Sequence, residues 1–180
     1  GDDDASPGSL LTFFEWPRSG RGRLGRGTFE SIGIETPTVT AEAIEEDPDG
    51  LQLRLYPGAA PRLHDVVAIG NPVLYAGLFA DDAPLSFAEP AEETALIGAG
   101  TTHHVAFRAP DVEALHEWTE RLRGFRLPSS GEVERFYFRS LYFREPNGIL
   151  FEIATDGPGF AVDEPMETLK KYLSSKTPRG

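Results

Sequence analysis

Three residues of types that bind metal ions lie in two strand-like segments of the second half of the chain. His103 and His104 belong to the segment 101–108, and Glu152 lies inside the apolar segment 149–154. A carboxylate among apolar neighbours is costly unless it is paired or bound to a metal. A histidine and a glutamate on neighbouring strands would form two thirds of a facial triad of two histidines and one carboxylate. The pattern therefore predicts a metal site with one ligand still to be found.

Strand alternation distinguishes the two histidines. In a strand over 101–108, His103 shares a face with apolar residues, which suits packing under a helix. His104 then lies on the opposite, concave face, and we expect it to be the ligand. His64 aligns with His103 in an internal repeat and is disfavoured as a ligand. His116 lies between the apolar positions of a predicted helix, so we expect it to be exposed.

The turn between two later strands predicts a further residue at the site. The segment 146–148, Pro-Asn-Gly, suits a three-residue hairpin loop with proline beginning a type I turn and glycine in the left-handed position. This register sets Glu145 opposite Ile149. It also sets Tyr142 opposite Glu152, on the same face. A phenol beside a metal-binding carboxylate can hydrogen-bond to a bound oxygen species or protonate it.

The elements that must position these residues form a degenerate repeat. Segment 27–37 resembles 100–110, segment 47–55 resembles 145–153, and 63–69 is a weaker third copy of the opening strand. The earlier copies have lost the candidate ligands: Ser31 and Asp65 replace His104, and Arg54 replaces Glu152. This asymmetry indicates that one unit kept a site while the others became scaffold.

The last copy is complete, whereas the earlier copies are shortened. Its strand 101–108 is followed by Asp111, a good N-cap, and by a predicted helix near 111–123 with an apolar stripe. Strands are predicted over 136–144 and 149–154, which makes the unit βαβββ-like. The earlier copies have no such helix. We infer that the sequence omits segments of the natural protein near 37–41 and 69–73.

Composition limits the classes of function. The chain of 180 residues has no cysteine, which excludes disulfides and thiolate metal sites and fits a cytoplasmic protein. Its net charge of −12 argues against a nucleic-acid binder, and no apolar run is long enough to span a membrane. The basic segment 18–27 is read as a solvated linker rather than an RNA-contacting loop. No phosphate-binding loop or serine-nucleophile motif is present.

Three segments resemble a known family. They are Gly-Thr-Thr-His-His-Val-Ala-Phe-Arg at 100–108, Tyr-Phe-Arg-Ser-Leu-Tyr-Phe-Arg-Glu-Pro-Asn-Gly at 137–148, and Phe-Glu-Ile-Ala-Thr-Asp-Gly-Pro-Gly-Phe at 151–160. They are similar to the vicinal oxygen chelate superfamily, and most similar to its ring-cleaving hydroquinone dioxygenase branch. The resemblance implies an α+β fold in which repeated βαβββ modules form curved mixed sheets, with several modules incomplete in this chain.

The resemblance and the repeat together divide the chain into five parts. We expect the end of a first module at 1–17, a second module without its helix at 18–57, a third module without its helix at 58–97, a complete module carrying the metal ligands at 98–160, and a tail or helix at 161–180.

The resemblance also implies roles for individual residues. Family members bind a mononuclear Fe(II), sometimes Mn(II), through two histidines and one glutamate, and His104 and Glu152 match two of these ligands. Tyr142 matches a tyrosine near the dioxygen or substrate site, Arg135 a substrate-contacting arginine, and His103 a histidine that assists proton transfer. The other histidine ligand is expected upstream of Gly1, so the present chain would be an inactive fragment of the enzyme.

The predicted activity is cleavage of hydroquinone- or catechol-type aromatic diols with dioxygen by a self-associating protein. Two alternatives stay open from the sequence. A glyoxalase-like lyase or isomerase would use the same scaffold with a Lewis-acid metal, and a bleomycin-resistance-type module would bind a ligand without a metal. A purely structural protein is disfavoured, because Glu152 would then be an unexplained buried acid.

Overall fold

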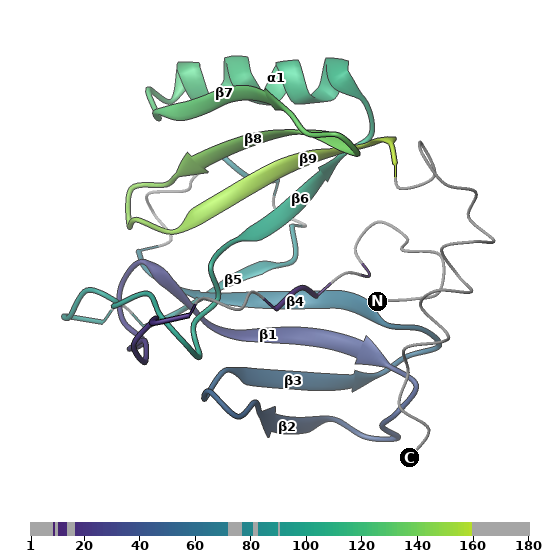
Figure 1. Cartoon of the computed structure of the whole chain (residues 1–180), viewed down its shortest axis with the longest axis vertical. Helices are drawn as coiled ribbons and strands as arrows, with labels where there is room; N and C mark the ends of the chain where they lie inside the picture. Colours follow the sequence, from purple (N-terminus) through teal and green to yellow (C-terminus); the bar gives the residue numbers. More distant parts are fainter. Residues whose placement is uncertain are drawn as a thin grey trace.

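The computed structural model describes residues 9, 11–13, 17–71, 77–80, 83–89 and 91–159. Within these ranges the chain forms two mixed β-sheets, and a single helix lies over one of them (Figure 1). The predicted α+β class is confirmed. The tail or helix expected at 161–180 lies outside the described residues. Among the described residues, no helix is long and apolar enough to cross a bilayer.

The first sheet has the strand order β2-β3-β1-β4-β5. Its strands are β1 (Thr28–Thr36), β2 (Ala43–Glu46), β3 (Gln52–Pro57), β4 (Arg62–Ile69) and β5 (Leu85–Ala88). Strand β1 runs parallel to β3 on one side and antiparallel to β4 on the other. Strand β2 forms a hairpin with β3, and β5 lies parallel to β4 at the other edge.

The second sheet has the order β6-β9-β8-β7 and contains the candidate site. Its strands are β6 (Val105–Ala109), β7 (Ser129–Glu134), β8 (Phe138–Arg144) and β9 (Leu150–Pro158). Strand β6 is parallel to β9, and the other neighbours are antiparallel. The two late strands form where they were predicted, although each begins later in the chain. Strand β7 is the one that the sequence pattern did not reveal.

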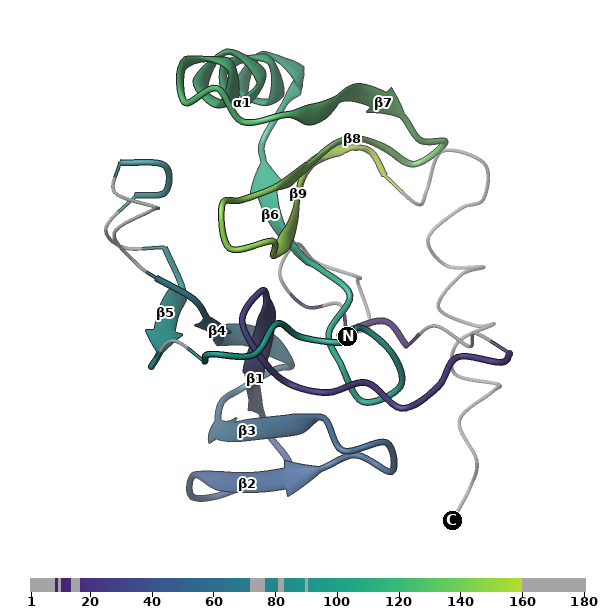
Figure 2. The same cartoon turned by 90° about the vertical axis from the view of Figure 1, so that its left-hand side faces the viewer.

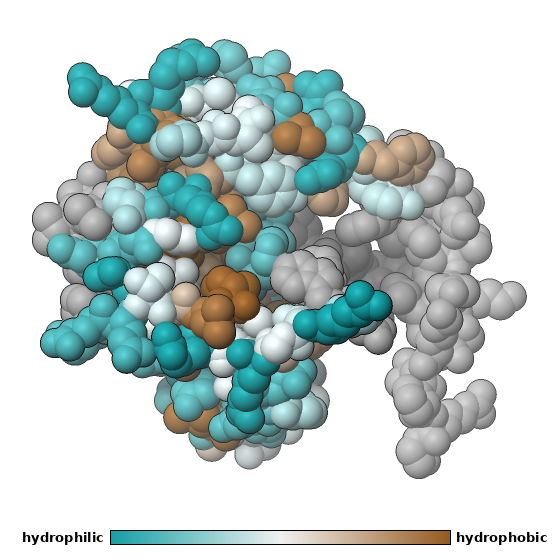
Figure 3. All heavy atoms as spheres, turned by 60° about the vertical axis from the view of Figure 1, so that its left-hand side comes forward, coloured by the Kyte–Doolittle hydropathy of each residue, from teal (hydrophilic) through white to brown (hydrophobic). Residues whose placement is uncertain are grey.

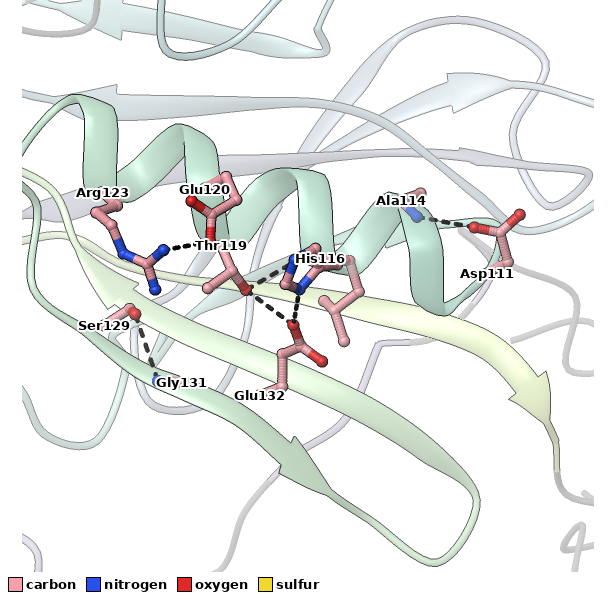
Figure 4. Close-up of polar contacts among 10 residues, drawn as sticks. Asp111, Ala114, His116, Thr119, Glu120, Arg123, Ser129, Gly131 and Glu132 are labelled. Carbon is pink, nitrogen blue, oxygen red and sulfur yellow. Dashed lines mark hydrogen bonds and ion pairs between the residues drawn. The ribbon is translucent and has the colours of Figure 1, made fainter.

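The helix α1 (Val112–Gly124) forms as predicted. Asp111 is its N-cap and accepts a hydrogen bond from the backbone N–H of Ala114 at 2.8 Å (Figure 4). Arginines in its last turn complement the helix dipole. Leu115 and Leu122 are fully buried, so the apolar stripe faces the core.

The strand pairings repeat between the two sheets. In each sheet the opening strand runs parallel to the second strand of a hairpin: β1 beside β3 in one, β6 beside β9 in the other. Gly33 faces Arg54 in the first pair, as Ala106 faces Glu152 in the second. Strand β1 leads to β2 without a helix between them, as predicted. The division of the whole chain into modules stays a prediction.

The core is shared by the two sheets and the helix. Phe29 of β1 meets Phe151 of β9 edge to face, with ring centroids 5.6 Å apart. Phe79 contacts the ring of Phe151 and the ring of Trp118 on α1. Figure 2 shows the first sheet beneath β6 and β9, with α1 on the far side of the second sheet. The two sheets therefore bury a common apolar surface.

The basic segment 18–27 is less free than a solvated linker. Its backbone forms bridges to the segment 94–99, between Arg21 and Ala99, Arg23 and Leu96, and Arg26 and Thr94. Glycine is needed at position 25, because a Cβ there would lie 2.7 Å from the carbonyl oxygen of Glu93. The segments 18–27 and 94–99 are thus held together by backbone pairing. Figure 3 shows one face of the molecule, where hydrophilic side chains cover much of the surface and apolar side chains appear in several small patches.

Candidate metal centre

Glu152 is a buried acid in the middle of β9. Only 5% of its surface is exposed, as its apolar neighbours in sequence predicted. It lies directly opposite Tyr142 of β8, so the predicted hairpin register is confirmed. The Glu145 N–H donates to the carbonyl oxygen of Ile149 at 3.1 Å, which closes the turn in the same register.

His104 lies next to Glu152, just before the other neighbouring strand, β6. Its Nε2 is 2.9 Å from Oε2 of Glu152. Two ligands of one ion, each about 2.1 Å from it and at right angles, would be separated by about 3.0 Å. The observed separation therefore fits a nitrogen and an oxygen on adjacent positions of a single metal ion.

Two side chains of types that bind metal ions, His104 and Glu152, meet at this place. Within the described ranges, no group of three or more histidine, cysteine, aspartate or glutamate side chains is arranged to hold a metal ion. His104 and Glu152 fit the predicted centre as two ligands of three. A complete centre needs a donor from elsewhere.

The second oxygen of Glu152 is held by a residue that the sequence reasoning missed. The hydroxyl of Ser140 donates to Oε1 of Glu152 at 2.5 Å, and Ser140 is fully buried. Burial opposes ionisation of Glu152, but hydrogen bonds from His104, Ser140 and Tyr142 outweigh it and lower the pKa of the carboxyl. Strand alternation places Ser140 on the same face as Tyr142, but a lone serine in a strand does not indicate its partner.

Tyr142 and Arg135 meet beside the two donors. The Tyr142 ring lies 6.0 Å from the His104 ring, measured between centroids. Burial and the hydrogen bond to Glu152 raise the pKa of Tyr142, so its phenol keeps its proton near neutral pH. The Arg135 guanidinium lies 5.5 Å from the centroid of the Tyr142 ring, and this arginine is exposed. A protonated phenol, from Tyr142, and a cation, from Arg135, thus lie close to His104 and Glu152.

The predicted orientation of His103 is wrong. Strand β6 begins only at Val105, so strand alternation does not apply to the two histidines that precede it. The Nδ1 atoms of His103 and His104 are 2.7 Å apart. Burial and the nearby charges of His104 and Arg144 lower the pKa of His103. Without a metal, Nε2–H of His104 donates to Glu152. With a metal bound, Nε2 would give up this proton, and Nδ1–H of His104 could donate to His103.

The other two histidines pair with acids elsewhere. His64 lies 3.1 Å from Glu35, measured from Nδ1 to Oε1, and stacks on Tyr56. His116 of α1 lies 3.0 Å from Glu132 of β7 and is exposed, as predicted (Figure 4). Each of these histidines thus has an acidic partner away from His104 and Glu152.

The matching face of the first sheet carries an ion pair instead of metal donors. Arg54, which takes the place of Glu152, pairs with Asp65 of β4 across Gly33. A Cβ at Gly33 would overlap Oδ1 of Asp65, so glycine is required for this arrangement. The Arg54 guanidinium is thus paired with the Asp65 carboxylate, which could otherwise have been a metal ligand at this place.

Comparison with known proteins identifies the family. Residues 21–153 match the family described as the glyoxalase/bleomycin resistance protein/dioxygenase superfamily. A Bacillus subtilis relative, MhqA, provisionally named a ring-cleaving dioxygenase, is 31% identical, with 97% of this chain and 78% of the relative covered. That match runs over 248 residues, more than the 180 of this chain.

Of two further matches, one covers a shorter part of the chain and the other shows a similarity of fold alone. The chlorohydroquinone/hydroquinone 1,2-dioxygenase of Sphingobium indicum is 36% identical over 74 residues, which cover 41% of this chain and 23% of the relative. A crystal structure of a provisionally named dioxygenase from Bacillus subtilis covers 95% of this chain and 76% of its own, at 24% identity and a TM-score of 0.78. The chain therefore belongs to the glyoxalase/bleomycin resistance protein/dioxygenase superfamily.

Proposed function

We propose that this protein is a ring-cleaving dioxygenase that acts on hydroquinone- or catechol-type aromatic diols with Fe(II), or alternatively Mn(II), as its metal. The observation that carries the proposal is the buried Glu152 carboxylate, 2.9 Å from Nε2 of His104. Facial ligation by two histidines and a carboxylate suits iron enzymes that must also hold a substrate and dioxygen. The names of the relatives point to the same class of reaction.

The chain's own residues divide the work as follows. Fe(II) held by His104 and Glu152 would supply the redox chemistry that joins dioxygen to an aromatic ring. The Glu152 carboxylate would offset the positive charge of the ion in a buried place, and Nε2 of His104 would bind the same ion. Tyr142 keeps a proton at its phenol oxygen for a reacting oxygen atom. Arg135 offers a cation to a substrate oxygen, and His103 holds the His104 ring in place.

We place the missing third ligand on a strand beside β6. In the first sheet, β4 lies antiparallel to β1 and sets Asp65 opposite the buried Gly33. In the second sheet β6 is an edge strand among the described residues, and Ala106, the counterpart of Gly33, is exposed. A strand paired with β6 in the same manner would present its side chain opposite Ala106, next to the two donors.

Two alternatives make different demands on the same site. A glyoxalase-like lyase would isomerise or cleave its substrate without consuming dioxygen. A bleomycin-resistance-type module would bind an aromatic ligand and need neither metal donor. The buried Glu152 carboxylate disfavours the metal-free module, because a binding pocket alone does not require a buried acid. The hydrogen-bonded phenol of Tyr142 beside this carboxylate favours the dioxygenase.

The test is oxygen uptake by the whole natural protein, loaded with Fe(II) without air and then mixed with hydroquinone or catechol. Dioxygen should be consumed in a 1:1 ratio with the ring-cleaved product. His104→Ala and Glu152→Gln should lower the rate at least about 100-fold. His116→Ala and Glu132→Gln, which disrupt the exposed His–Glu pair, should leave it unchanged. Turnover without oxygen uptake would favour the lyase, and binding without turnover would favour the ligand-binding module.

We also propose that the protein is cytoplasmic and self-associating, and that its partners are a small diol and dioxygen rather than nucleic acid or membrane. The absence of cysteine supports the cytoplasmic location, and the net charge of −12 argues against nucleic acid as a partner. The names of the relatives support the diol and dioxygen.

A further inference from the structure

Glu152 is held from both sides of its strand. Strand β9 lies between β6 and β8, so the residue has one neighbouring strand on each side. His104, just before β6, approaches Oε2 at 2.9 Å. Ser140, on β8, donates its hydroxyl to Oε1 at 2.5 Å. Each carboxylate oxygen therefore has its own partner, on opposite sides.

The Ser140 hydroxyl is placed so that it fixes the orientation of the Glu152 carboxylate. It has no exposed surface, so no water competes for its hydroxyl. Its hydroxyl also lies beside the Tyr142 phenol, which links the two residues to one carboxylate. A serine hydroxyl has one proton to donate, and here that proton is directed to Oε1. Without it, the carboxylate could rotate so that both oxygens faced the metal position.

We propose that Ser140 is a positioning residue that makes Glu152 a one-oxygen metal ligand. The inference rests on the proposed metal function. A carboxylate that binds through both oxygens occupies two coordination positions, whereas one oxygen occupies a single position. With two histidines, single-oxygen binding leaves three positions of six for a diol and dioxygen. Ser140 thereby keeps open the position that a turned Glu152 would fill.

The first test needs no metal. Compared with a crystal structure of the native chain, that of Ser140→Ala should show the Glu152 carboxylate turned, so that Oε1 leaves its place beside position 140 and both oxygens face Nε2 of His104. Ser140→Cys fills the same space but donates a poor hydrogen bond, so the carboxylate should turn in that variant also. Thr28→Val is the matched control. Thr28 is buried too, and its hydroxyl has no hydrogen-bond partner among the described residues, so its removal should leave Glu152 in place.

The second test measures Co(II) binding to the same four proteins. Ser140→Ala and Ser140→Cys should bind Co(II) about 10- to 100-fold more weakly than the native chain and Thr28→Val. Their Co(II) absorption should weaken per ion, as expected for a higher coordination number. Thermal unfolding of each variant verifies that it is folded before either measurement.

The outcomes separate this inference from the proposed function. A Glu152 carboxylate that stays in place in Ser140→Ala, or a Ser140→Cys protein with native geometry and affinity, would overturn the role of Ser140. If the carboxylate turns as expected but the natural protein consumes no dioxygen with any diol, the role of Ser140 stands and the dioxygenase proposal fails.

Discussion

At the scale of single residues, the site depends on how one buried carboxylate is satisfied. Glu152 is surrounded by a ring nitrogen, a serine hydroxyl and a phenol, and these together lower its pKa despite burial. An ionised, fixed carboxylate is the form that binds a divalent metal. At the matching place, the first sheet has an ion pair between Arg54 and Asp65. The His104–Glu152 pair, which we propose to bind the metal, and the Arg54–Asp65 ion pair thus occupy equivalent positions on the two sheets.

Removing the Tyr142 hydroxyl should separate metal binding from turnover. Tyr142→Phe keeps the ring beside His104 but loses the phenol proton near Glu152. We expect metal content to stay near that of the native protein and oxygen uptake to fall about 10²- to 10⁴-fold, the range for loss of a general acid. Tyr56→Phe, on the first sheet, is the control and should keep full activity. Equal loss of metal and activity in Tyr142→Phe would assign the phenol to metal binding instead.

Some contacts of this site could be predicted from the sequence, and others could not, for physical reasons. The pairing of Tyr142 with Glu152 could be predicted, because a Pro-Asn-Gly turn fixes the register of a hairpin. The orientation of His103 could not, because alternation holds only within a strand and β6 starts two residues later. Ser140 was overlooked because a serine in a strand carries no signal of its own until its partner is known.

At the scale of elements, the turn joining β8 and β9 holds the two strands that carry the site. Glu145 is buried in this turn, where its Oε1 accepts from the Ile149 N–H at 2.6 Å and its Oε2 from the Asn147 N–H at 2.7 Å. Asn147 also reaches the first sheet, accepting a hydrogen bond from the Asn71 N–H at 3.0 Å. The turn therefore sets the register of the hairpin and ties it to the other sheet.

Truncation of Glu145 should destabilise the hairpin. Glu145→Ala leaves two backbone N–H groups without acceptors, each of which costs about 1–3 kcal/mol when buried. We expect the free energy of unfolding in urea to fall by about 2 kcal/mol or more. Glu134→Ala, which removes an exposed acid paired with Arg139, should cost less than about 1 kcal/mol. Equal effects of the two substitutions would show that the turn contacts contribute little.

The packing of Asp65 over Gly33 makes a second prediction at this scale. Gly33→Ala would bring a methyl group into the Asp65 carboxylate and strain the contact between β1 and β4. We expect a loss of about 1–3 kcal/mol in the free energy of unfolding. Gly124→Ala, at the end of α1, has nothing within 4 Å of the added methyl group and should be neutral or stabilising. Native-like stability of Gly33→Ala would show that Asp65 moves aside without cost.

The elements themselves were predictable to different degrees. The helix α1 carried an N-cap and an apolar stripe, and it formed where expected. Strand β7 lacked a clear pattern, because it is an edge strand with mostly exposed side chains and a register shift near Gly131. The bridges of the basic segment to 94–99 could not be foreseen, since backbone pairing between two loops depends on glycines and leaves no periodic pattern.

At the scale of the whole molecule, the two sheets behave as one packed body. Residues of both contribute to a single apolar cluster, and Phe151 touches Phe29 of the other sheet as well as Phe143 of its own. The resemblance in sequence predicted repeated strand units, but how the two sheets pack on each other required the structure. A shared core couples the site in the second sheet to the scaffold in the first.

Unfolding should therefore be a single cooperative transition. Circular dichroism in the far and near ultraviolet should give the same midpoint in urea. Phe151→Ala should lower the free energy of unfolding by about 3–5 kcal/mol and keep the transition single. Two separate transitions in the native chain would show that the sheets unfold independently.

The central claim is that His104 and Glu152 bind one metal ion. The most direct measurement is anomalous X-ray scattering at the iron edge from crystals of the chain soaked with Fe(II) without air. The account predicts one iron peak within about 2.0–2.2 Å of Nε2 of His104 and of Oε2 of Glu152, and no such peak in His104→Ala. No peak at this place in the native chain, or the same peak in His104→Ala, would contradict the account.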